Sequence, residues 1–562
     1  MSAGKIYDAV IVGSGAAGGM AAYMLAGSGL DVLVLEAGPR FDLYKDFKTH
    51  AWPYEEKYRG RISPRDAHNY KYGFADGYTT HIYARLDENP YSTPEGRPFD
   101  WVRARAVGGR TLVWGRVSLR LSDFDFKAKS HDGYGEDWPI SYADIAPYYD
   151  RVERMIGVSG TREGLPQLPD GVFQKPVPLL CGERILKKGV EKTGRRLIPT
   201  RCGVTMERLP HNKYRAPCHW CGTCGRGCDV GAMFNSHVAL LAPALETGKL
   251  TIRPDSVVRE VLVDNNTGKA RGVSFVDRKT KKDYEVYGKV VVLGASTLES
   301  TRIMLNSKSR LYPNGIANSS GVLGHYLHDH IWGVSFTGFA PQLKGREIVN
   351  EDGRPQGTYI PRFRNLDNAS RQQKYIRGFG YQCGSGSGIF PGHARNTLGF
   401  GSEFKREVRA LHPAFVRMSG FGEVLPRFEN YVEIDPNLKD AWGIPCLRIN
   451  IVYGDNEAEM VKDIIACAQE MFEAAKIEMV SMHTEPYPPG HSIHEVGTAR
   501  MGDDPKSSVL NKWCQAHDIK NLFVMDGSCF VSDGCQNPTL TILALAMRSS
   551  EYLIEQFKRG EL

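Results

Sequence analysis

The clearest pattern of hydrophobic and polar positions lies in residues 9–35. Residues 9–12 form an apolar run, glycines follow at the spacing GxGxxG, helix formers continue to Leu25, and residues 32–35 are apolar again. A short apolar run bounded by glycine is typical of a buried strand, and a longer alanine-rich run is typical of a helix. The pattern predicts strand, turn, helix and strand, the first unit of an α/β fold.

Two later patterns predict further elements. The short runs HIWGVSF at residues 330–336 and CLRINIVY at residues 446–453 are typical of antiparallel strands. Asn is a favoured N-cap and Pro a favoured first helical residue, so we expect a helix to open at Asn537 and Pro538. The chain should therefore contain an antiparallel sheet in addition to the α/β unit.

Length and charge exclude several classes of protein. A chain of 562 residues is too long for one small core, so we expect two domains or one large domain with insertions. The net charge of +7 comes without a basic block, which argues against nucleic acid as a partner. Residues 9–30 are uncharged, but six glycines and the lack of a signal pattern indicate a buried strand and turn, not a signal peptide or membrane span.

The glycine turn predicts a dinucleotide site. Gly13 permits the tight turn, Gly15 lets the backbone approach a pyrophosphate, and Gly18 lets helix and strand pack closely. The helix N-terminus offers free N–H groups to the phosphates. Glu36 ends the second strand and is placed to accept a hydrogen bond from a ribose hydroxyl. This motif alone does not separate FAD from NAD.

Four of the twelve cysteines lie within eleven residues, in CHWCGTCGRGC at residues 218–228. The spacing C-x2-C-x2-C-x3-C resembles a ferredoxin cluster loop, in which small intervening residues let the backbone wrap an inorganic core. A structural zinc site usually splits its cysteines into two pairs about 12–20 residues apart, so the compact run favours an iron–sulfur cluster over zinc. The last cysteine of such a run often serves a second cluster, so the spacing does not by itself give four ligands to one [4Fe-4S] cluster.

Several segments, in the same order and over nearly the whole chain, resemble successive signatures of the glucose-methanol-choline (GMC) flavoprotein oxidoreductases. They are the glycine turn with Glu36, RAVGGRTLVWG at 105–115, VVVLGASTLESTRIML at 290–305, HEVGTARMG at 494–502 and DGCQNPTLTI at 533–542. The resemblance implies FAD as the cofactor and an α/β fold with the GMC architecture. In that architecture a discontinuous Rossmann-like FAD-binding domain is combined with an antiparallel-sheet substrate domain that carries helices.

The resemblance also divides the chain into interleaved segments. The FAD-binding domain would comprise residues 1–45, 101–125, 215–325 and 490–562, and would include the cysteine loop 218–228. The substrate-binding domain would comprise residues 46–100, 126–214 and 326–489.

Carried over residue by residue, the family's catalytic histidine corresponds to His494 and its second active-site position, which is His or Asn, to Asn537. His494 would take the proton of a substrate hydroxyl while the carbon's hydride moves to the flavin, and Asn537 would hydrogen-bond the same oxygen. Further family positions that contact FAD correspond to Gly108, Gly109, Asp526 and Gly527. Relatives with covalent flavin carry a THW triplet where this sequence has LVW at 112–114, so we expect FAD without a covalent link.

The cysteine loop resembles the [3Fe-4S] loop in catalytic subunits of FAD-dependent bacterial sugar dehydrogenases of this family. The resemblance implies a [3Fe-4S] cluster on Cys218, Cys224 and Cys228, and the additional Cys221 leaves a [4Fe-4S] cluster open. A cluster implies electrons exported one at a time to another protein, and therefore a dehydrogenase and not an oxidase.

Residues 132–160 look most like the catalytic subunits of glucoside 3-dehydrogenases and of related gluconate and sorbitol dehydrogenases. This implies oxidation of a pyranose or glucoside secondary hydroxyl, at C3, with a small subunit carrying a twin-arginine signal and a cytochrome c acceptor. We expect a periplasmic enzyme co-exported with that subunit, or a cytoplasmic one. Oxidation at sugar C1, of gluconate or of a polyol, and an oxygen-using glycoside 3-oxidase, are the alternatives. Four polar residues of the substrate domain are interpreted as structural: His328, His330, Gln382 and Glu423.

Overall fold

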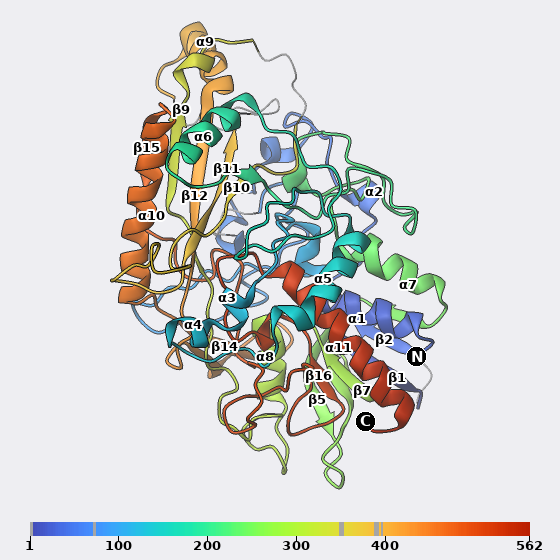
Figure 1. Ribbon diagram of the computed structural model, residues 1–562. Coiled ribbons are helices and arrows are strands. Elements are labelled where there is room, and N and C mark those ends of the chain that lie inside the picture. The colour runs from blue at the N-terminus through green and yellow to red at the C-terminus, as the bar shows by residue number, and fades with distance from the viewer. Residues whose placement is uncertain (1–3, 71–74, 348–352, 387–392, 395–396) are drawn as a thin grey trace.

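The computed structural model describes residues 4–70, 75–347, 353–386, 393–394 and 397–562, and these residues form two large sheets (Figure 1). The first sheet has the order β4-β2-β1-β7-β6-β5, with β16 paired to β7. Its strands are β1 (Ile6–Val12), β2 (Val32–Leu35), β4 (Leu250–Arg253), β5 (Ser256–Val263), β6 (Ala270–Asp277), β7 (Asp283–Leu293) and β16 (Leu522–Val524).

The centre of this sheet is parallel and buried. β1 pairs in parallel with both β2 and β7, and β16 pairs in parallel with β7. Every residue of β2 is buried, as expected for a strand covered on both faces. Helix α1 (Ala16–Gly27) contacts α11 (Thr539–Arg559), which in turn contacts α5 (Tyr142–Ile156). The first unit predicted from the sequence is confirmed.

The second sheet is antiparallel and has the order β15-β9-β12-β11-β10-β3, with β8 paired to β12. Its strands are β3 (Ile198–Pro199), β8 (His330–Ile331), β9 (Ser335–Phe339), β10 (Thr358–Ile360), β11 (Phe379–Ser385), β12 (Phe415–Glu423) and β15 (Glu478–His483). Two long helices, α10 (Asp455–Ala474) and α6 (Cys181–Lys192), contact this sheet (Figure 1). α10 buries Met460, Ile464, Cys467 and Met471, an apolar stripe at helical spacing.

The remaining strands and α-helices are the hairpin β13 (Tyr431–Lys439) and β14 (Pro445–Asn450), and the helices α2 (Leu43–Asp46), α3 (Asp123–Phe126), α4 (Ala128–Asp132), α7 (Ala242–Glu246), α8 (Thr297–Asn306) and α9 (Gly401–Leu411). Within the described ranges, no helix combines the length and the apolar composition that a bilayer crossing requires. The predicted α/β class with a second, antiparallel sheet is confirmed.

One predicted boundary differs from the structure. Helix α11 begins at Thr539, with Pro538 as its N-cap residue, one residue later than the expected N-cap at Asn537 and first helical residue at Pro538. The side chain of Asn537 does not cap the helix because it is hydrogen-bonded to His494 and Gln382. Of the two roles that the sequence predicts for Asn537, helix cap and site residue, its side-chain contacts therefore fit the second.

Candidate active site

A large cavity lies between the two sheets. From the first sheet and its connections come residues 12–17, 35–37, 256–258, 294–297 and 526–527, and from the second sheet come Gln382 and Phe421. Ligands of open α/β sheets bind at the carboxyl ends of the parallel strands, which is where β1, β2, β7 and β16 meet this cavity. The cavity therefore reaches from a nucleotide-type sheet edge to the face of the antiparallel sheet.

The glycine turn fits a pyrophosphate. Gly13 has φ +89°, and a Cβ there would lie 2.4 Å from the carbonyl oxygen of Gly294. A Cβ on Gly18 would lie 2.0 Å from the carbonyl oxygen of Gly13, so the turn and α1 can pack only with glycine at both positions. A Cβ on Gly15 would meet nothing within 4 Å, and Gly15 borders the cavity. The cradle has the shape that an FAD pyrophosphate requires.

Glu36 lies at the end of β2, and it borders the cavity. Its Oε2 accepts hydrogen bonds from Ser14 N at 3.1 Å and Ser14 Oγ at 2.6 Å, and its Oε1 accepts one from Gly38 N at 3.0 Å. Burial raises the pKa of Glu36, and these donors oppose the shift. Ser14 Oγ also accepts from Gly108 N at 2.9 Å, and a Cβ on Gly109 would lie 3.2 Å from Gly15 Cα, so segment 108–109 packs against the turn.

Some of the other residues predicted to contact FAD line the cavity, and others lie behind its wall. Asp526 and Gly527 follow β16 and border the cavity, as do Gly13, Gly109 and the Val113–Trp114 pair. Gly18 and Gly108 lie behind the wall. The residues present fit FAD; the non-covalent attachment stays a prediction.

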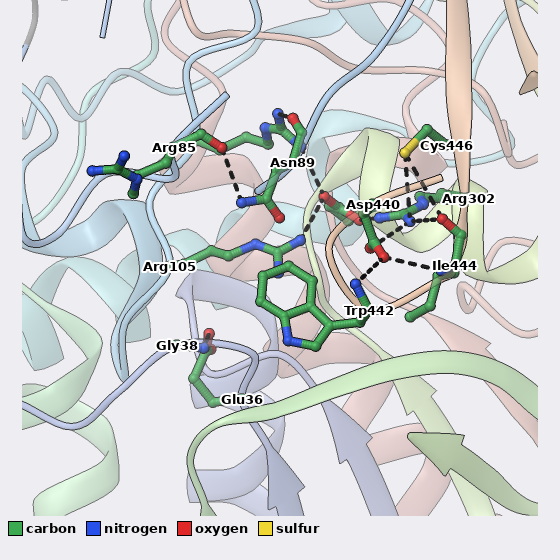
Figure 2. Close-up of polar contacts among 12 residues, drawn as sticks. Glu36, Gly38, Arg85, Asn89, Arg105, Arg302, Asp440, Trp442, Ile444 and Cys446 are labelled. Atoms are coloured by element: carbon green, nitrogen blue, oxygen red, sulfur yellow. Dashed lines mark hydrogen bonds and ion pairs between the residues drawn. The ribbon is translucent and has the colours of Figure 1, made fainter. Parts of the chain in front are cut away.

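A cluster of charged residues borders the cavity, and Figure 2 shows Arg105, Arg302 and Asp440 of this cluster together with Glu36. Glu299 of α8 lies within 3.3–3.4 Å of guanidinium nitrogens of Arg103, Arg105 and Arg302. Arg302 also pairs with Asp440 at 2.7 Å. Burial would raise the pKa of Glu299, but Arg302, Arg105 and Arg103 outweigh burial and lower it to about 2.

Glu299→Gln should lower the free energy of unfolding by about 3–5 kcal/mol, because it leaves buried guanidinium groups without their shared carboxylate. Since the folded pKa lies below the unfolded value of 4.5, this contribution is complete above that value and is lost as pH falls toward about 2. Urea denaturation at neutral pH measures it, with the more exposed Glu285→Gln as the matched control. Equal destabilisation by the two variants would contradict the role of the cluster.

His494 and Asn537 meet at the other end of the cavity. Asn537 Nδ2 donates a hydrogen bond to His494 Nε2 at 3.1 Å, and Gln382 Nε2 donates to Asn537 Oδ1 at 3.1 Å. Burial, and then the neighbouring His330 and Arg110, lower the pKa of His494 well below 6.5. The imidazole is therefore neutral at neutral pH, with an acceptor nitrogen directed at Asn537.

The loop that carries His494 is strained and tightly held. Ile493 has φ +64°, which is rare for a β-branched residue and must be enforced by its surroundings. The buried Asp329 carboxylate accepts from Gly490 N at 2.6 Å and from His494 N at 3.2 Å. Arg110 pairs with Glu495 at 2.7 Å on the other side of the histidine. Sequence reasoning missed Asp329 and Arg110, because neither contact is local in the chain.

Of the four polar residues interpreted as structural, two lie at the site and two lie away from it. Gln382 borders the cavity and His330 Nδ1 lies 3.1 Å from His494 Nδ1, so both belong to the site. His328 and Glu423 are buried away from the cavity wall, where Glu423 faces Arg377 at 3.4 Å. His328 and Glu423 keep their structural interpretation because neither borders the cavity.

The cysteine loop encloses a second, small cavity lined by Cys218, Cys221, Cys224 and Cys228. All four thiols are free. A Cβ on Gly227 would lie 2.7 Å from the ring of Phe47, so the loop can follow this path only with glycine there. Within the described part of the chain, no three cysteine sulfurs lie within 4.8 Å of one another. A tetrahedral zinc ion with Zn–S bonds of about 2.3 Å needs sulfurs roughly 3.8 Å apart, and no three cysteine sulfurs of the described residues lie that close together.

Two buried arginines lie beside this loop. Arg116 and Arg215 donate to backbone carbonyl groups, Arg116 to Leu112 O at 2.8 Å and Arg215 to Gly231 O at 2.9 Å. No ion pair joins either arginine to a carboxylate among the residues that the structure describes, and Cys228 is the charge neighbour that both share. Buried cations require compensation, which a cluster on thiolates would supply. Arg116 also borders the large cavity, so it lies between the two sites.

A dinucleotide-type glycine cradle and a neutral histidine paired with an amide, in one cavity, define an oxidoreductase site. The sequence matches the GMC oxidoreductase family over residues 7–332 and again over residues 426–546. The chain belongs to the GMC oxidoreductases, which implies FAD as the cofactor and a CH–OH group as the position oxidised.

Two characterised relatives match almost end to end. The chain is 29% identical to the 2-methyl-1,2-propanediol dehydrogenase of Mycolicibacterium austroafricanum, over 98% of this chain and 95% of that protein. It is 29% identical to the fructose dehydrogenase large subunit of Gluconobacter japonicus, over 98% of each. Among solved structures, the pyridoxine 4-oxidase from Mesorbium loti shares the fold, with a TM-score of 0.60, 17% identity, and coverage of 97% of this chain and 99% of that one.

Proposed function

We propose that the protein is an FAD-dependent dehydrogenase that oxidises a secondary hydroxyl of a pyranose or glucoside, at C3, to a ketone. The observation that carries the reaction type is the 3.1 Å contact between Asn537 Nδ2 and His494 Nε2 at the cavity wall. An acceptor nitrogen and a donor amide side by side can bind the two sides of one hydroxyl group.

The chain's own residues then perform the proton chemistry. The substrate hydroxyl donates to His494 Nε2 and its oxygen accepts from Asn537 Nδ2, which replaces the contact between the two side chains. Gln382 holds the Asn537 amide so that its N–H group points at this position. Bound FAD supplies the hydride acceptor. The histidine, neutral because of burial, takes the hydroxyl proton as the carbonyl forms.

The substrate end of the cavity suits a sugar ring. Trp332 and Phe421 border it with ring centroids 4.2 Å apart, and Gln382 adds a polar contact beside them. Apolar faces with a few placed polar groups are typical of sites for small polar ligands. The fructose dehydrogenase and propanediol dehydrogenase relatives are named for a sugar and a diol, which supports a polyhydroxylated substrate.

The cysteine loop supports export of electrons. We assign a [3Fe-4S] cluster to Cys218, Cys224 and Cys228. In the alternative, a [4Fe-4S] cluster, Cys221 is the fourth ligand. Such a cluster is a one-electron carrier, so the acceptor in this proposal is a cytochrome c and not oxygen. The fructose dehydrogenase relative is named as a large subunit, which supports a small partner subunit, here one that carries a twin-arginine signal into the periplasm.

Anaerobic addition of methyl glucoside should reduce an artificial electron acceptor rapidly, because a blocked C1 leaves only ring and side-chain hydroxyls to oxidise. Product analysis by NMR should place the new ketone at C3. Free glucose is the control. Reduction with glucose but not with methyl glucoside would move the reaction to C1, and peroxide formation in air without a dye would favour the oxidase.

A further inference from the structure

The Nδ1 nitrogen of His494, which faces away from Asn537, has a partner that the mechanism above leaves unused. It lies 3.1 Å from His330 Nδ1, and the two rings are nearly perpendicular at 85°. His330 is in β8 and is fully buried. Two facing ring nitrogens can form a hydrogen bond only if one carries a proton and the other does not.

The contact at the other ring nitrogen of His330 decides which nitrogen carries the proton. His330 Nε2 lies 3.0 Å from the carbonyl oxygen of Gly534. A carbonyl oxygen is only an acceptor, so Nε2 holds the proton of the neutral ring and Nδ1 is left as a bare acceptor. His494 Nδ1 must then be the donor, and His494 Nε2 is left without a proton.

We infer that His330 is a positioning residue that holds the His494 proton on Nδ1 and thereby keeps Nε2 free to receive the proton of the substrate hydroxyl. The inference rests on the proposed role of His494 as the base. It extends to this chain the logic of hydrolase triads, in which a buried group sets the tautomer of the histidine. In this chain the carbonyl oxygen of Gly534 sets the tautomer of His330, and His330 in turn sets the tautomer of His494. No carboxylate is needed for this effect.

The groups around His330 keep it neutral, as this role requires. Burial, opposed by Gly534 and supported by His328, lowers the pKa of His330 to about 3. The carboxyl group of Asp533 lies 3.4 Å from His330 Nδ1, and neither of its oxygens has a hydrogen-bond partner among the described residues. Burial, with Glu423 and Asp329 adding to it, raises the pKa of Asp533 well above 3.8, which opposes the negative charge that would favour a second proton on His330.

Three variants separate a tautomer effect from a packing effect. His330→Asn retains an acceptor oxygen near the place of Nδ1, whereas His330→Leu removes it and keeps the volume. His328→Leu is the matched control, since His328 is buried on the same segment and bonds to Tyr326 O at 2.8 Å, not to His494. If His330→Leu does not fold, His330→Gln, which can still donate to Gly534, replaces it.

The deciding measurement is two-bond ¹H–¹⁵N NMR of ¹⁵N-histidine protein, with the His494 signals assigned by their loss in His494→Gln. We expect His494 to carry its proton on Nδ1 in the wild type, His330→Asn and His328→Leu, and to populate the Nε2–H form in His330→Leu. Flavin reduction should slow about 10²-fold in His330→Leu with KM little changed, and less than about tenfold in His330→Asn. An Nδ1–H tautomer that persists in His330→Leu, or its absence in the wild type, would overturn the inference. Because NMR needs no substrate, failure of the proposed reaction would leave this result intact.

Discussion

His494→Gln should slow reduction of the bound flavin by alcohol on the order of 10³-fold, the central part of the range for loss of a general base. The structure places one acceptor nitrogen, His494 Nε2, beside the donor amide of Asn537 at 3.1 Å. Glutamine keeps a polar side chain of similar length but offers no nitrogen that can accept a proton. The proton of the hydroxyl then has no acceptor at the required position.

Anaerobic stopped-flow absorbance measures this loss directly, as bleaching of the flavin at saturating substrate. The FAD content of each variant, read from the oxidised spectrum, separates slow chemistry from poor cofactor binding. His211→Gln, an exposed histidine that bonds to Met155 O, is the control and should retain the wild-type rate. A His494→Gln rate within tenfold of the wild type would show that another group takes the proton.

The pH dependence of the same reaction follows from burial. Because the folded pKa of His494 lies well below 6.5, the base is already neutral at neutral pH. Between about pH 8 and pH 6 the wild-type rate should not fall, and it should decline only as pH approaches the lowered pKa, where the imidazole gains a proton. A midpoint near the ordinary histidine value would contradict this assignment.

Each of the single variants Cys218→Ser, Cys224→Ser and Cys228→Ser should lose the iron and acid-labile sulfide of the cluster, whereas Cys221→Ser should retain them. The four thiols line one small cavity, and the proposed [3Fe-4S] cluster would use three of them. Serine oxygen is a poor replacement for a thiolate at a soft iron site. Transfer to a one-electron acceptor should stop in the first three variants while flavin reduction by substrate continues.

Iron and sulfide analysis, together with EPR of the oxidised protein, tests this prediction. A three-iron cluster gives about three iron atoms per chain and an EPR signal in its oxidised form, whereas a [4Fe-4S]²⁺ cluster is EPR-silent. Cys181→Ser, at an exposed cysteine outside the loop, is the control. Loss of iron in Cys221→Ser as well would establish four ligands, and bound zinc in place of iron would remove the cluster from the proposal.

Local signals in the sequence predicted the first unit of the fold. The strand, glycine turn and helix of residues 6–27 follow from periodicity and glycine spacing, because their interactions join residues close in the chain. The pairing of Asn537 with His494 is not a local interaction, and only the resemblance to a family brought the two together.

No local pattern in the sequence could predict the contacts of other residues with His494 and Asn537. Asp329 directly precedes β8, His330 begins β8, and Gln382 lies in β11. Each contacts a residue more than 150 positions away in the chain. A histidine in an apolar run is most often a satisfied core residue, and Ile493 gives no hint of a positive φ, since isoleucine avoids that region. Such features depend on tertiary contacts that periodicity does not encode.

The position of β7 between β1 and β16 sets when the cofactor can be captured during biosynthesis. β1 and β16 both pair with β7, and Asp526 and Asn537 follow β16, so the cavity wall is incomplete until about residue 540 has left the ribosome. At 5–20 residues per second, roughly 25–105 seconds separate the synthesis of β1 from that of β16. During that time the nucleotide turn has no complete site around it. FAD can therefore meet a complete cavity wall only after the segment up to about residue 540 has left the ribosome and has folded.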